Sequence, residues 1–138
     1  MGVDAQAAQD FLRTHHNGVL ATRRSDGRPQ LSPVTATVDE AGRVIISTRE
    51  RSMKVKHLRR DPYASLVVLS DDFYGDWVQV EGPAEIISLP DALELLVDYY
   101  RRAGGEHPDW AEYRQAMIDQ QRVLVRFPIE RAGPNVGG

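Results

Sequence analysis

The chain has 138 residues, 41% of them hydrophobic and 27% charged, which is the composition of a folded globular protein with its own core. It contains no cysteine, so disulfides, thiolate catalysis and cysteine-ligated metals are excluded. Its apolar runs are too short to span a membrane, and the N-terminus lacks the basic-then-apolar pattern of a secretory signal. We therefore expect one cytoplasmic domain over residues 1–138.

The first part of the chain predicts one helix and three strands. The helix covers residues 4–16, and Asp4 can cap its start. The Asp-Gly pair at 26–27 is typical of a hairpin turn between the first two strands, and β-branched residues mark the third. The three strands are expected over residues 18–24, 29–38 and 43–49.

The rest of the chain predicts three more helices and three more strands. Ser52 has the position of a helix N-cap, and Pro62 must end the short helix that follows. The segment 90–104 is the clearest helix, with proline at its start, glycine at its end and an apolar stripe that ends at Tyr100. A shorter helix follows Pro108. The strands are expected over residues 63–69, 77–87 and 122–130.

Six short strands joined mostly by tight turns indicate a largely antiparallel sheet. Pro33, Gly82 and Pro83 imply bends or bulges, which favour a closed or nearly closed barrel with small helices at its ends and sides. The strand 63–69 is apolar on both faces, more than a small barrel interior requires. We therefore expect part of it to lie in a homodimer interface.

The common catalytic and metal-binding motifs are absent from the sequence. It contains no phosphate-binding loop, no dinucleotide-binding glycine motif and no serine-hydrolase elbow. None of the four histidines, at positions 15, 16, 57 and 107, has a metal-ligand spacing supported by a carboxylate. We expect no metal site.

Positive charge gathers in one stretch of a chain whose formal net charge is −3. Residues 48–62 contain both lysines, Lys54 and Lys56, and four arginines. Because a helix N-terminus offers unpaired N–H groups and a partial positive charge, this stretch suits an anion. Residues two apart do not lie side by side on a helix, so only one lysine can face that anion. A solvated surface helix is the alternative, while the acidic remainder of the chain argues against nucleic acid.

The order of these elements and several of their sequences resemble the pyridoxamine 5'-phosphate oxidase-like split β-barrel superfamily. The resemblance covers nearly the whole chain and rests on "GVLATRRSDGRPQLSPV", "STRERSMKVKHLRRDPYASLVVL" and "WVQVEGPAEI". Within the superfamily, "AGGEHPDWAEYRQAM" and "RVLVRFPIERAGP" are similar to the branch that uses the deazaflavin coenzyme F420.

This resemblance implies a six-stranded antiparallel Greek-key split β-barrel and a homodimer with two cofactor sites at the subunit interface. It implies an F420-dependent oxidoreductase that transfers a hydride between the deazaflavin and a small conjugated substrate. Lys54 would bind the cofactor phosphate, Lys56 occupies a position that is usually basic, and Trp77 would line the site from the other subunit. The other cofactor-binding residues that it implies are Gln30, Ser32, Pro33, Val34, Ser47, Thr48, Arg51, Ser52 and Met53.

Two departures from the deazaflavin branch keep FMN open as the cofactor. Relatives often have arginine at the position of Ser52, for which Arg51 is one residue away, and asparagine at the position of Pro33. The alternatives are an FMN-binding oxidoreductase of the pyridoxamine-phosphate-oxidase type and a protein that carries F420 or FMN without turnover. In the two oxidoreductase hypotheses the hydride chemistry belongs to the cofactor ring, so no catalytic side chain is identified.

Overall fold

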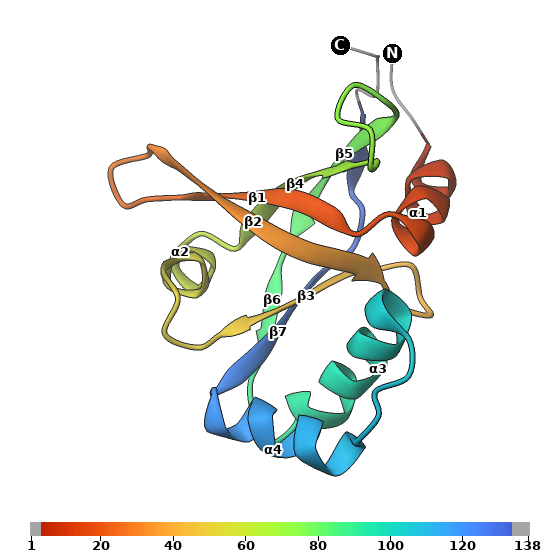
Figure 1. Ribbon diagram of the computed structural model, residues 1–138. Coiled ribbons are helices and arrows are strands. Elements are labelled where there is room, and N and C mark those ends of the chain that lie inside the picture. Colours follow the sequence, from red (N-terminus) through yellow and green to blue (C-terminus); the bar gives the residue numbers. More distant parts are fainter. Residues whose placement is uncertain (1–3, 134–138) are drawn as a thin grey trace.

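The computed structural model describes residues 4–133, which form four helices and eight strands (Figure 1). The helices are α1 (Ala5–Thr14), α2 (Met53–Arg60), α3 (Ala92–Gly104) and α4 (Trp110–Asp119). The strands are β1 (Asn17–Arg23), β2 (Pro29–Val38), β3 (Val44–Arg49), β4 (Tyr63–Leu69), β5 (Trp77–Pro83), β6 (Glu85–Ile87), β7 (Arg122–Phe127) and β8 (Arg131–Ala132). Each predicted helix is present, and the predicted bounds of β2 and β4 agree to the residue.

Local signals account for several of these elements. The Asp4 carboxylate caps α1 as predicted, because its Oδ1 accepts a hydrogen bond from the Ala7 amide at 2.7 Å. Gly27 has a φ of +87°, the left-handed conformation that glycine tolerates best in the β1–β2 turn. Among residues 4–133, no helix has the length and apolar character needed to cross a membrane.

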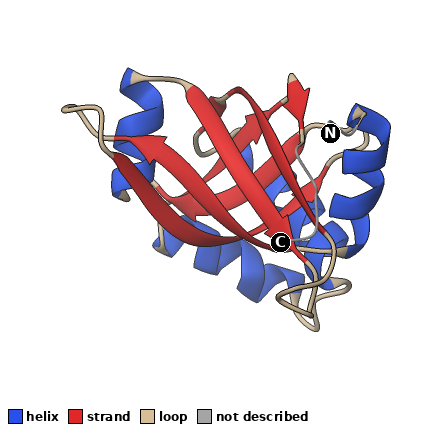
Figure 2. Ribbon diagram, turned by 90° about the horizontal axis from the view of Figure 1, so that it is seen from above, coloured by secondary structure: helices blue, strands red, loops and turns tan. Residues whose placement is uncertain are grey.

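The strands form one antiparallel sheet in the order β6-β7-β3-β2-β1-β4-β5-β8. Strands β5 and β6 stand far apart in this order, yet a single residue, Ala84, joins them along the chain. The sheet must therefore curl round on itself, as Figure 2 shows. This curled antiparallel sheet is consistent with the predicted split barrel.

The prediction of six strands was wrong, because the segment 77–87 is two strands and the chain adds a short eighth. Pro83 has no N–H for a ladder, and the Ala84 amide donates instead to the Pro62 carbonyl at 2.9 Å. Before this break β5 pairs with β4, and after it β6 pairs with β7. Strand β8 lies just beyond the last predicted strand, which was expected over residues 122–130, and pairs with β5.

Two apolar cores hold the fold together. The first fills the curled sheet and includes Ile46 and Val125. The second lies between the sheet and the helices α3 and α4, and contains Ile45 and Leu124, the neighbours of those two residues along β3 and β7. Because successive strand residues point to opposite faces, β3 and β7 contribute to both cores. Helices α3 and α4 are thereby fixed against the outer side of the barrel (Figure 1).

Candidate functional site

A cavity of about 490 Å³ lies where β2 and β3 separate. The two strands pair only from Ala36 opposite Ile46 to Val38 opposite Val44. The earlier part of β2 pairs with β1 alone, whereas the end of β3 continues alongside β7. The volume lies within the range of about 300–1,000 Å³ that is usual for small-molecule sites.

The cavity brings together residues from six elements and one turn. Five of its lining residues are among the predicted cofactor-binding residues: Pro33, Val34, Ser47, Thr48 and Lys54. The other lining residues, which were not predicted as site residues, are Thr35, Tyr99, Tyr100, Tyr113, Met117, Gln120 and Arg122. Two of the three segments on which the superfamily resemblance rests therefore meet at this cavity, but they form only part of its lining.

Four predicted residues of the basic stretch lie outside this lining. Arg51, Met53 and Lys56 are exposed to solvent. Ser52 occupies the N-cap position of α2, but its side chain caps no helix amide; its Oγ instead accepts a hydrogen bond from Thr48 Oγ1 at 3.3 Å. Lys54 is therefore the cation of the basic stretch that lines the cavity.

Three predicted strand residues also lie outside the lining. Gln30 and Ser32 are nearer the β1–β2 hairpin, opposite Thr22 and Leu20 of β1, and Ser32 is buried. Trp77 starts β5 and is separated from β2 by both β1 and β4, a distance of about 14 Å at the usual strand spacing. The expectation that Trp77 contributes from a second subunit stays a prediction.

The charge of the cavity comes from two cations, Lys54 and Arg122. The lining contains no aspartate or glutamate, and within residues 4–133 neither cation has a carboxylate oxygen within 4.0 Å. Partial burial and the neighbouring Arg122 lower the pKa of Lys54. Burial and the nearby charge of Arg49 lower that of Arg122. Both shifts express the cost of holding like charges together away from water, which an anion would offset.

Three tyrosines form the wall of the cavity on the α3–α4 side. The Tyr99 hydroxyl donates to the Thr35 carbonyl at 2.8 Å, and that of Tyr113 donates to the Leu96 carbonyl at 2.9 Å. Burial raises the pKa of Tyr113 to about 12, so its hydroxyl stays protonated as a donor. Trp110 and Tyr113 meet edge to face with ring centroids 5.6 Å apart, which places Trp110 one ring away from the cavity.

Helix α2, which carries Lys54, is anchored to the barrel by His57. The imidazole is buried, and its Nδ1 lies 3.0 Å from Thr22 Oγ1 of β1. Burial lowers the pKa of His57, and the charges of Arg60 and Arg24 lower it further.

The lowered pKa of His57 predicts that the folded protein becomes less stable in acid. Because the folded-state pKa of His57 is below the usual value of about 6.5, the native protein prefers the neutral imidazole. The stability that the neutral imidazole contributes is fully present above about pH 6.5. It is lost as the pH falls from about 6.5 through the folded-state pKa of His57. Urea unfolding between pH 5 and 8 should show this dependence, and His57→Gln should reduce the slope. An equal slope in the variant would assign the acid loss to other groups.

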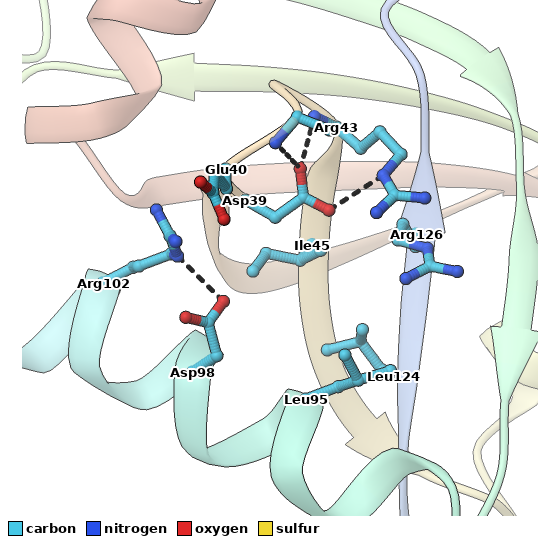
Figure 3. A pocket seen from close by; sticks show the side chains of 10 residues that line it. Asp39, Glu40, Arg43, Ile45, Leu95, Asp98, Arg102, Leu124 and Arg126 are labelled. Atoms are coloured by element: carbon cyan, nitrogen blue, oxygen red, sulfur yellow. Dashed lines mark hydrogen bonds and ion pairs between the residues drawn. The ribbon is translucent and has the colours of Figure 1, made fainter.

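A second cavity, of about 370 Å³, lies between the β2–β3 hairpin, β7 and α3 (Figure 3). Its three arginines each have a carboxylate partner, in the pairs Arg43–Asp39 at 2.9 Å, Arg102–Asp98 at 2.8 Å and Arg126–Glu85 at 2.6 Å. The cations of this cavity are therefore neutralised by the protein itself. An anionic ligand would be bound more favourably beside Lys54 and Arg122.

Metal binding has no comparable support. In the part of the chain that the structure describes, no three histidine, aspartate or glutamate side chains form a group that could hold a metal ion. The residues that line the cavity between β2 and β3 could hold a cofactor.

Known proteins resemble this chain over almost its whole length. A family model described as pyridoxamine 5'-phosphate oxidase matches residues 5–134. A conserved hypothetical protein from Mycobacterium tuberculosis is 29% identical, with a TM-score of 0.77 over 99% of this chain and 93% of its own. An F420 reductase is 20% identical, with a TM-score of 0.67 over 94% of this chain and 96% of its own. A heme-binding protein from Mycobacterium smegmatis is 20% identical, with a TM-score of 0.72 over 97% of this chain and 54% of its own.

Proposed function

Because the chain belongs to the pyridoxamine 5'-phosphate oxidase family, we propose that it is an oxidoreductase that binds coenzyme F420 in the cavity between β2 and β3. The similarity to an F420 reductase is a likeness of fold, and the same fold is found in a heme-binding protein. The observation that carries the proposal is therefore the cavity itself, with two cations and no carboxylate in its lining. FMN, which also joins a planar ring to a phosphate through a side chain, is the alternative cofactor.

The lining residues suit such a cofactor in two ways. Lys54 would bind its phosphate, and the hydroxyls of Ser47 and Thr48 end the strand beside it. Tyr100 and Met117 belong to the aromatic and apolar wall, which would contact a planar ring and exclude water. The bound deazaflavin would supply the hydride, and the protein would hold the ring and the substrate in place.

Parallel titrations with F420 and FMN test this proposal. Trp110 lies one ring from the cavity, so its fluorescence should be quenched as either cofactor fills the site. The chain has two tryptophans, and comparing wild type with a Trp77→Phe variant separates the signal of Trp110 from that of Trp77. We expect saturable binding with a preference for F420. A preference for FMN would favour the alternative cofactor, and no binding of either would reject the proposal.

Turnover separates an enzyme from a protein that only carries the cofactor. Reduced cofactor would be mixed with the protein and with enones, quinones or tetrapyrroles, and its reoxidation followed by absorbance. We expect the protein to accelerate oxidation of the reduced cofactor by at least one of these classes of compound. Tight binding with no acceleration across the panel would support the carrier hypothesis.

An apolar face of the sheet supports a homodimer in which the site is completed by a second copy. Val19, Val67 and Leu69 lie on the face of β1 and β4 opposite the barrel core, together with exposed Leu31 of β2. Pro33 is paired with Val19 in the same sheet and also lines the cavity. A second copy seated on this face would therefore lie beside the cofactor cavity.

Val67→Asp should convert the expected dimer to monomers. A carboxylate left unpaired in an apolar interface costs about 3 kcal/mol or more, and a two-fold interface contains it twice, so dimer affinity should fall more than about a hundredfold. Sedimentation across the micromolar range measures this, with Val67→Thr as the near-isosteric control. A wild-type monomer, or a dimer unchanged by Val67→Asp, would contradict the assignment of this face.

A further inference from the structure

Arg122 is a second cation of the candidate site, outside the basic stretch that the sequence indicates. We infer that Arg122 and Lys54 together bind the phosphate of the cofactor, and that Gln120 positions the Arg122 guanidinium for this contact. The identity of the cofactor rests on the proposed function, whereas the anionic character of the site rests on the cavity alone.

Arg122 lies among other positive charges. It begins β7 and pairs directly with Arg49 of β3, and it lines the same cavity as Lys54 of α2. Like charges opposite one another on neighbouring strands destabilise a sheet. In residues 4–133 none of these three cations has a carboxylate oxygen within 4.0 Å. The fold thus concentrates positive charge at one place, and a bound anion would relieve the repulsion.

The partner of Arg122 is neutral, and this distinguishes it from the next arginine of the strand. Arg122 Nε donates to Gln120 Oε1 at 2.9 Å, which fixes the guanidinium without neutralising it. Arg126, four residues further along β7, is instead paired with the Glu85 carboxylate at 2.6 Å. The Nη groups of Arg122 are the donors with which arginine binds phosphate oxygens in a two-pronged contact.

Relatives in the deazaflavin branch often have arginine at the position where this chain has Ser52. Arg51, one residue away, is exposed and does not line the cavity. Arg122 of β7 supplies a guanidinium to the cavity instead.

Gln120→Glu is the sharpest test, because it keeps the hydrogen-bond acceptor and adds a negative charge beside Arg122. The matched control is Gln115→Glu, which adds the same charge to an exposed position of α4. Each protein would be titrated with FMN and with riboflavin, which has the same ring but no phosphate. A charge-assisted phosphate contact predicts that wild type and control bind FMN at least about tenfold more tightly than riboflavin. In Gln120→Glu this ratio should fall to about one.

The possible outcomes separate this inference from the proposed function. If the ratio stays high in Gln120→Glu, or is about one in wild type, the inference is overturned while ring binding still supports the proposed function. If only F420 binds, the affinity for F420 is compared instead of the FMN-to-riboflavin ratio. The inference then predicts that this affinity falls about tenfold or more in Gln120→Glu and not in Gln115→Glu. If neither cofactor binds, the proposed function fails and inorganic phosphate decides. Inorganic phosphate should raise the unfolding temperature of wild type and of Gln115→Glu but not of Gln120→Glu. If phosphate does not raise the unfolding temperature of wild type, the inference is overturned.

Discussion

Replacing Lys54 by alanine should weaken binding of the phosphorylated cofactor by about tenfold to a hundredfold, the value of one charge-assisted hydrogen bond to phosphate. Lys54 is half-buried and belongs to the first turn of α2, where the helix N–H groups also favour an anion. The Ser52 side chain caps none of these N–H groups. The ammonium and the helix end can therefore act on the same phosphate. A fluorescence titration with F420, or with FMN if F420 does not bind, measures the loss.

Lys56→Ala is the matched comparison, because it removes the same side chain from the same helix. Lys56 is exposed and does not line the cavity, so its loss should change the affinity by less than about threefold, and added salt should reduce that effect. Equal losses in the two variants would mean that the basic stretch acts only as diffuse charge. The phosphate would then lie elsewhere.

Gly82→Ala should destabilise the protein by about 3 kcal/mol, at the upper end of the cost of overpacking a core. Gly82 lies in β5 where the segment after β7 crosses it, and an added Cβ would collide with the Pro128 carbonyl oxygen. The backbone fixes the position of the Cβ, and the carbonyl that it meets is itself backbone, so no side chain can move aside. The crossing segment would have to withdraw, which breaks the hydrogen bond from the Glu130 amide to the Glu81 carbonyl and the pairing of β8 with β5.

Urea unfolding of Gly82→Ala and Gly104→Ala checks this expectation. Gly104 ends α3, and a Cβ there would meet only the Tyr100 ring at an ordinary distance of 3.5 Å. The control should therefore lose nothing, and it can gain up to about 1 kcal/mol from the better helix propensity of alanine. A stability for Gly82→Ala equal to that of the control would show that the crossing is not a tight constraint.

The sequence predicted those parts of the fold that have local causes. The Asp-Gly turn, the alternating strand 29–38 and the apolar strand 63–69 are all encoded within about ten residues, and the structure contains each of them. Gly82 and Pro83 were interpreted as a bend, but the bend is a change of partner from β4 to β7. The residues around Gly82 and Pro83 contain no local signal that predicts which strands pair with this segment.

The same limit applies to the candidate site. Lys54, Ser47 and Thr48 were found because they lie within one resembling segment of the chain. Arg122 was missed because it enters the cavity only through the pairing of β3 with β7, whose paired residues are more than 70 positions apart in the sequence. Tyr99 was missed because the apolar stripe predicted for α3 includes Tyr100 and not Tyr99. The helix packs between the sheet and α4, so side chains on both of its sides are in contact with the rest of the protein.

A crystal structure of the protein with its preferred cofactor tests the central claim most directly. We expect electron density for the phosphate in contact with Lys54 Nζ and the Arg122 guanidinium, and density for the ring beside β2 in the cavity between β2 and β3. A cofactor bound instead in the cleft of Arg43, Arg102 and Arg126, or with its phosphate away from Lys54, would contradict the account.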